Sequence, residues 1–265
     1  MVCFIPMVRP PHPKDTTMTS AAVDALRADH GALVNITTSL SDEQWSAPSG
    51  CAGWAVRDVV GHMTQLFRQV VDPGGLPPPD PSLSTERTQE RWVEAMRQEP
   101  VEHLVADYRT LGDQAIGALA GMQGNDTVVD LGDLGRHPLH LIANAFAFDH
   151  YTHIRVDLFA PAGPLGADPP PADERHLEAA ADWIVAGIPQ MSPDAVTQPV
   201  ELVLTGPGGR TAHLGPDGAP DATVTSSVRD LVLWSTGRSS WRDLDVSISG
   251  DPAVAEHFCG TVHVF

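Results

Sequence analysis

Two residues four positions apart, Asp149 and His153, carry the clearest chemistry in the sequence. Their surroundings have helical apolar spacing, and residues four apart share a helix face, so this carboxylate and imidazole could bind one metal ion. His62 lies in a second apolar helical stretch. Two imidazoles and a carboxylate leave coordination positions open, which is typical of a catalytic divalent metal. We expect zinc first, with nickel or iron as alternatives.

These histidines also have a simpler interpretation. A histidine on an apolar helix face often bonds to a backbone carbonyl in the core and binds no metal. His150, three residues before His153, is a rival ligand that points to a different part of the face. His137 and His140 come several turns earlier, and we expect them near the helix entrance or at the surface. Spacing alone leaves these alternatives open.

The elements that must position these residues are predicted to be helices. Apolar spacing predicts long helices over 21–40, 55–71, 101–122 and 138–159 and a shorter one over 86–98. Asp72-Pro73-Gly74-Gly75 ends the second long helix. The sequence therefore predicts a helical bundle over 19–160, preceded by a proline-rich disordered leader over 1–18.

The character of the sequence changes after residue 160. Residues 161–171 are rich in proline and glycine and form the expected linker. The remainder, 172–265, predicts a small α+β domain in which short strands alternate with helices and Gly206–Gly209 forms a hairpin turn. The strands are expected over 200–204, 211–214, 222–225 and 246–249, and the helices over 172–188, 228–236 and 252–258. The fold class is thus two-domain α+β.

The stretch from Trp45 to His62, WSAPSGCAGWAVRDVVGH, resembles the signature of the mycothiol-dependent maleylpyruvate isomerase family. This family is a branch of the DinB-like metal-binding superfamily. Its signature ends in a metal-binding histidine, which falls on His62. The resemblance implies two further ligands from a Glu-xxx-His motif on the fourth bundle helix, which falls on Asp149 and His153. Asp149 departs from the usual glutamate and shortens that ligand.

The resemblance continues in the C-terminal half. VRDLVLWSTGR, ending at Arg238, and VSISGD over 246–251 are similar to motifs of the family's appended α+β domain. The resemblance implies a DinB-like four-helix bundle followed by that domain. It also implies mycothiol as thiol cosubstrate and an isomerase or S-transferase acting on a small electrophile such as an unsaturated keto acid.

Arg238 is our candidate catalytic residue in that half. It follows a glycine at the end of a predicted helix, where its guanidinium could bind a carboxylate of the substrate or the thiol. A salt bridge at the helix end is the alternative. Cys51 has no partner base recognisable in the sequence, so we interpret it as a small loop residue and not as a nucleophile.

Composition and charge exclude several classes of protein. A formal charge of −18 repels nucleic acid and anionic membrane surfaces, and no apolar run is long enough to cross a bilayer. Three cysteines without a CxxC pair favour a reducing cytoplasm. Lys14 is the only lysine, which is typical of high-GC, actinobacterial-type coding. Monomer and homodimer both remain open.

Two other functional classes remain open. The exchange of glutamate for Asp149 motivates a non-catalytic protein that kept the fold and binds a metal or ligand. A metal-dependent hydrolase with an activated water is the third possibility, and it would need no thiol. Metal content and thiol dependence distinguish the three.

Overall fold

The computed structural model of the chain describes residues 13–78, 80 and 82–265. Residues 1–12 of the expected leader over 1–18 lie outside the described residues. From Pro13 onward the chain is helical, because α1 runs over Pro13–Thr37. The helical region thus begins before the predicted start at residue 21.

Four helices form the bundle that carries the candidate ligands: α1, α3 (Val56–Val71), α5 (Val101–Gly121) and α6 (Ile142–Thr152). The shorter α4 (Thr85–Met96) packs on α3. The bundle core is apolar and aromatic, with Leu26, Leu33, Met63, Phe67 and Tyr108 buried in it. Burial of these apolar stripes holds the helices together.

The fourth long helix is less regular than the sequence predicts. The predicted helix over 138–159 is a 3₁₀ turn at Leu139–Leu141, then α6, then a π-helical turn at His153–Leu158. The carbonyls of Asp157 and Leu158 accept hydrogen bonds from the amides of Gly50 and Leu165, at 2.8 and 2.9 Å. Loop amides therefore satisfy these carbonyls at the end of the π-helical turn. Such π turns occur often at functional sites.

A short helix and a pair of short strands lie where the sequence analysis predicts no element. Residues 42–46 form the short helix α2 (Asp42–Ser46), which begins with a capping box between Ser41 and Gln44. Strands β1 (Val128–Asp130) and β2 (Arg136–Pro138) form an antiparallel pair just before the last bundle helix. Both are too short for apolar periodicity to reveal.

The C-terminal half contains a four-stranded sheet in the order β4-β3-β5-β6. Its strands are β3 (Val200–Thr205), β4 (Thr211–Leu214), β5 (Ala222–Ser227) and β6 (Ser247–Gly250), and only β3 and β5 run parallel. Helices α7 (Glu174–Met191), α8 (Val228–Ser235) and α9 (Pro252–Thr261) contribute to the core on its buried face. The predicted α+β fold class is confirmed.

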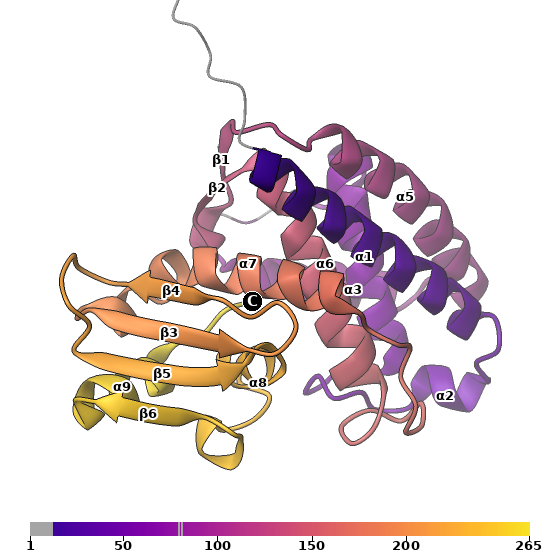
Figure 1. Cartoon of the computed structure of the whole chain (residues 1–265). Coiled ribbons are helices and arrows are strands. Elements are labelled where there is room, and N and C mark those ends of the chain that lie inside the picture. The colour runs from indigo at the N-terminus through magenta and orange to yellow at the C-terminus, as the bar shows by residue number, and fades with distance from the viewer. Residues whose placement is uncertain (1–12, 79, 81) are drawn as a thin grey trace, which may run out of the picture.

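Helix α7 connects the two halves. The chain between Leu158 and Glu174 runs through irregular turns, which include the expected linker. α7 then packs against α1 and α6 of the bundle, while Trp183, Ile184 and Ile188 are buried in the same core as the sheet. Figure 1 shows α7 between the sheet and the bundle helices. This packing fixes how the C-terminal half lies against the end of α6.

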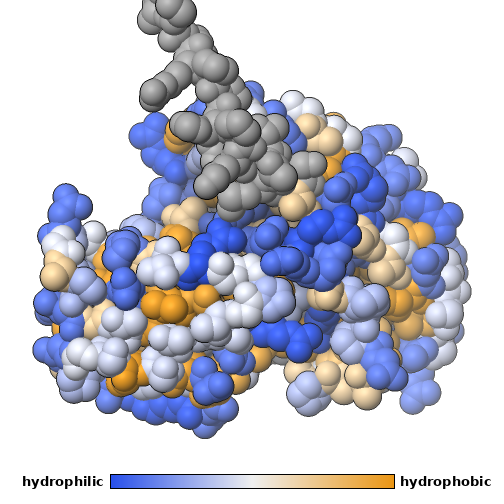
Figure 2. All heavy atoms as spheres, in the orientation of Figure 1, coloured by the Kyte–Doolittle hydropathy of each residue, from blue (hydrophilic) through white to orange (hydrophobic). Residues whose placement is uncertain are grey.

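No large apolar patch is visible on the face shown in Figure 2, where hydrophobic side chains lie in small groups among hydrophilic ones. The exposed large hydrophobic side chains of the described residues are Val128 and Phe265. Among the described helices, none is long and apolar enough to span a bilayer.

Candidate metal centre

The three candidate ligands meet at one point between two bundle helices. His62 comes from the middle of α3, and Asp149 and His153 come from the end of α6. Asp149 Oδ1 lies 3.0 Å from His62 Nε2 and 3.4 Å from His153 Nε2. One donor atom from each residue lies within 4.8 Å of the others. The packing of α3 against α6 thus brings together residues 87 positions apart.

The geometry of this donor set fits a zinc-type ion. Zinc bonds to nitrogen and oxygen of about 2.0–2.1 Å place neighbouring ligand atoms about 3.3–3.4 Å apart in a tetrahedron. The spacings at Asp149 Oδ1 are close to that edge. Its second oxygen, Oδ2, is buried and has no hydrogen-bond partner among the described residues. A buried oxygen without a partner is costly, and a cation would satisfy it.

The ligands differ in their access to solvent. The side chain of His62 is 5% exposed, whereas that of Asp149 is 21% exposed. Trp54, from the loop before α3, packs on both histidine rings, with centroid distances of 5.3 and 6.5 Å. Asp149 is thus the most exposed of the three ligands, and Trp54 covers the two imidazole rings.

Charge within the site is strongly coupled. Burial by itself would raise the pKa of Asp149, but its attraction to His62 and His153 outweighs this and holds the pKa well below the usual value. For His153, burial would lower the pKa, and the attraction to Asp149 raises it well above the usual value instead. The carboxylate is thus ionised throughout the neutral range, as a metal ligand must be.

A fourth residue, Asp157, is part of this site and was missed in the sequence analysis. Its Oδ2 lies 2.7 Å from His153 Nδ1, and its side chain is 1% exposed. Asp157 follows His153 by four positions, just as His153 follows Asp149 by four. The same helical spacing that identified the first pair was therefore a usable signal for the second.

Arg238 also reaches the site. Its Nε and Nη2 donate to the two oxygens of Asp157 at 2.9 and 2.5 Å. Gly237, at φ +71°, ends α8, and the Arg238 amide bonds back to the carbonyl of Leu233 at 2.9 Å, which directs the following chain toward the bundle. Arg238 thus forms a salt bridge with Asp157 and also lies beside the candidate ligands. Its Nη1 has no acceptor among the described residues.

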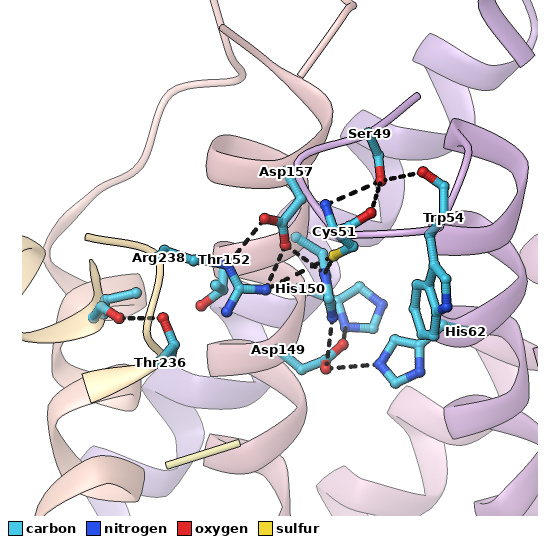
Figure 3. Close-up of polar contacts among 12 residues, drawn as sticks. Ser49, Cys51, Trp54, His62, Asp149, His150, Thr152, Asp157, Thr236 and Arg238 are labelled. Carbon is cyan, nitrogen blue, oxygen red and sulfur yellow. Dashed lines mark hydrogen bonds and ion pairs between the residues drawn. The ribbon is translucent and has the colours of Figure 1, made fainter. Parts of the chain in front are cut away.

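Cys51 has neighbours that the sequence does not reveal. Its Sγ lies 3.6 Å from His153 Nδ1 and 4.0 Å from Arg238 Nη2. The hydroxyl of Ser49 holds this loop, since it accepts from the Cys51 amide and donates to the Trp54 carbonyl (Figure 3). Cys51, His153 and Asp157 also form a compact donor group. The guanidinium of Arg238 beside it disfavours a cation there.

The remaining histidines lie outside the ligand group. His150 Nδ1 lies 2.9 Å from the carbonyl of Phe146, and its fully buried ring packs on Phe67 with a centroid distance of 4.9 Å. Burial lowers the pKa of His150 to about 4, so it is neutral. His137 is buried against Trp183, and His140 lies 2.9 Å from Asp126. His150 is therefore a core histidine bonded to a carbonyl, as the simpler interpretation expects.

Fold and site together define a class: a helical bundle with a His-Asp-His metal-type cluster, completed by an arginine from a C-terminal α+β domain. Family models match both halves of the chain. Residues 26–159 match the mycothiol maleylpyruvate isomerase N-terminal domain, and residues 165–257 match the MDMPI C-terminal domain. The chain belongs to the mycothiol-dependent maleylpyruvate isomerase family.

Solved structures agree with this fold. Two crystal structures of the mycothiol-dependent maleylpyruvate isomerase, one of them a mutant, align with TM-scores of 0.55 and 0.54. Their sequence identities to this chain are 15% and 14%, and each alignment covers 87% of this chain and 92% of the other. No curated protein matches the sequence.

Proposed function

We propose that the protein is a metal-dependent isomerase that uses mycothiol to convert a small unsaturated keto acid, such as maleylpyruvate, from the cis to the trans form. One observation carries the proposal. His62, Asp149 and His153 converge within 4.8 Å of one another at the end of a bundle, beside a guanidinium from the second domain. Family membership supports the thiol and the reaction class.

In this proposal His62, Asp149 and His153 hold the metal, with zinc expected first and nickel or iron as alternatives. When bound, the metal supplies Lewis acidity that polarises a carbonyl or lowers the pKa of a thiol. Trp54 and Asp157 orient the imidazoles, and Asp149 lies at the side open to solvent. The protein thereby holds one donor atom from each of the three ligands close to the others.

Arg238 is proposed to bind a carboxylate of the substrate. Asp157 already occupies its Nε and Nη2 edge, so the end of the guanidinium that carries Nη1 is left for a ligand. The thiolate of mycothiol adds to one carbon of the activated double bond and forms a C–S bond, while the π electron pair moves onto the conjugated keto oxygen as an enolate. Rotation about the resulting single bond follows. The enolate pair then returns to form the double bond in the trans form, and the C–S bond breaks and releases the thiolate.

The thiol is therefore consumed and regenerated in each turnover, and this distinguishes isomerisation from net thiol transfer. The proposal assigns the protein to the cytoplasm of an actinobacterial-type cell, where a low-molecular-weight thiol stays reduced. Its partners are then this thiol and a small acid, with neither nucleic acid nor membrane involved. It can act as a monomer, because all proposed site residues come from one chain.

The test combines metal content with thiol dependence. We expect about one zinc-type ion per chain by plasma mass spectrometry and conversion of maleylpyruvate only when both the metal and mycothiol are present. Loss of metal with retained turnover would reject the metal role. Turnover without mycothiol would reject the thiol role and favour a hydrolase or another chemistry.

A non-catalytic binding protein is the competing proposal, because Asp149 is shorter than the family's glutamate. The spacings argue against loss of the site, since Asp149 Oδ1 still lies 3.0 Å from His62 Nε2. If metal binds but maleylpyruvate is inert with and without mycothiol, the substrate is a different acid or the site only binds. A screen of unsaturated keto acids with mycothiol separates these outcomes.

A further inference from the structure

We propose that Asp157 is a positioning residue that sets the orientation of His153 and of Arg238 at the same time. This inference rests on the proposed function and goes beyond it, because it assigns the coupling between the two domains to one carboxylate. Asp157 is buried and lies in the π-helical turn that follows α6. It lies next to the candidate ligands without being one of the three.

The first half of the argument concerns His153. Asp157 Oδ2 lies 2.7 Å from His153 Nδ1, so the carboxylate accepts a hydrogen bond from the N–H of that nitrogen. When a metal displaces the other ring proton, the lone pair that binds it belongs to Nε2, which is the nitrogen that lies toward Asp149 and His62. A carboxylate in this place fixes both the tautomer and the ring angle of a metal-binding histidine.

The second half concerns Arg238. Asp157 receives its Nε and Nη2 in a bidentate pair, and Figure 3 shows the guanidinium extending from the C-terminal domain to this carboxylate. Arg238 lies 81 positions further along the chain. A bidentate pair fixes the plane of the guanidinium as well as its place. The Nη1 end of the guanidinium is thereby held in one orientation, because Asp157 keeps the Nε and Nη2 edge from rotating.

The backbone holds Asp157 itself in place. Its carbonyl accepts from the amide of Gly50 at 2.8 Å. A Cβ atom at Gly50 would lie 2.9 Å from the Asp157 Cα, which is closer than real Cβ atoms pack, and 3.0 Å from its Oδ1, which is tighter than most such contacts. The loop that carries Cys51 and Trp54 is thus pressed directly onto this residue. A carboxylate anchored from its backbone can transmit its position to both partners.

The test uses Asp157→Asn. This change keeps the shape of the side chain but replaces a carboxylate oxygen, which accepts hydrogen bonds, with an amide nitrogen, which donates them. The probe is Co²⁺ in place of the native metal, and its affinity is read from the d–d absorption. Asp29→Asn is the matched control, since Asp29 also joins a buried histidine and arginine but lies outside the candidate metal group. Asp182→Asn, at a partly buried carboxylate that is also paired with an arginine, is the control if Asp29→Asn is too unstable.

We expect Asp157→Asn to weaken Co²⁺ binding by about 10- to 100-fold and the control to leave it unchanged. We also expect the KM for maleylpyruvate to rise, and adding Arg238→Gln to Asp157→Asn should raise it little further, because both changes remove one aimed guanidinium. If Asp157→Asn does not fold, Asp157→Ala replaces it, because alanine places no amide nitrogen against the donors of His153 and Arg238.

Three outcomes would overturn the inference. If wild-type protein binds no Co²⁺, the proposed function fails and the inference fails with it. If the wild type binds Co²⁺ and Asp157→Asn binds it equally well, the inference alone fails. If Asp157→Asn and Asp29→Asn weaken binding alike, Asp157 acts only through general stability, and its positioning role is rejected.

Discussion

The molecule contains two triads of aspartate, histidine and arginine that share one chemistry and differ in surroundings. In the site triad Asp157 joins His153 and Arg238. In the core triad Asp29, from α1, receives Arg155 at 2.6 and 3.0 Å and lies 3.2 Å from His176 Nε2. Both aspartates are 1% exposed. Similar buried ion pairs thus occur at the edge of the bundle and inside it.

The difference lies in what the second histidine nitrogen faces. His176 Nδ1 lies 2.9 Å from Asp173, which caps α7. Neither residue belongs to a group of possible metal ligands among the described residues. His153 Nε2 faces Asp149, and Asp149 in turn meets His62. The core triad therefore joins α1, the π-helical turn and α7. The site triad instead lies beside the three candidate metal ligands, and the Nη1 end of Arg238 is left to bind a ligand.

The largest expected effect is a difference in metal content between variants of His153 and His176. We expect His153→Ala to lower metal content from about one ion per chain to almost none, because one of three protein ligands is lost. His176→Ala should retain the metal in whatever fraction folds. Plasma mass spectrometry on both variants measures this directly. Full metal stoichiometry in His153→Ala would contradict the assignment of His153 as a metal ligand.

The second comparison concerns stability in the absence of metal. Asp29→Asn leaves Arg155 buried without its counter-charge, and we expect a loss of about 3–5 kcal/mol. Asp157→Asn should cost less, about 1–3 kcal/mol, because Arg238 is 21% exposed and can reach water. Urea denaturation of chelator-treated proteins gives both values. The reverse order would contradict the view that the core triad is the structural one.

A smaller effect is expected at Asp173, which contacts His176 of the core triad from outside the triad. Asp173 accepts from the amide of Arg175 at the start of α7 and contacts His176, but it is half exposed. Asp173→Ala should cost about 1 kcal/mol, the usual value for a lost N-cap. Asp173→Asn keeps the cap and serves as the control. Equal losses in the two variants would show that charge, not capping, dominates there.

The smallest effect is a change in pH dependence. Burial alone would raise the pKa of Asp29, but hydrogen bonds from His176 and Arg155 outweigh it and lower the pKa. A lowered carboxyl pKa stabilises the fold above the usual value of 3.8, and this contribution is lost as the pH falls through the folded value. The stability gap between wild type and Asp29→Asn should therefore be constant above about pH 5 and narrow below it. Urea midpoints from pH 7 to pH 3 test the sign, and a gap that widens in acid would contradict it.

How much the sequence predicts can be seen residue by residue. His62, Asp149 and His153 were identifiable because helical periodicity places them on apolar faces, where polar groups need a partner. Asp157 has the same spacing from His153, but its role depends on Arg238, which no local pattern connects to it. Cys51 seemed to lack a basic partner because that partner, His153, is 102 positions away.

The sequence by itself determined the long helices, the strands of the C-terminal sheet, the donor types and the resemblance to a family, because these depend on local periodicity and on short motifs. Tertiary structure alone decided which donors converge, that His150 bonds to a carbonyl, and that Arg238 reaches Asp157 across the two halves. The physical reason is distance along the chain. Contacts between α3 and α6, and between α7 and both cores, are set by the packing of whole faces, and no residue spacing within one segment encodes them.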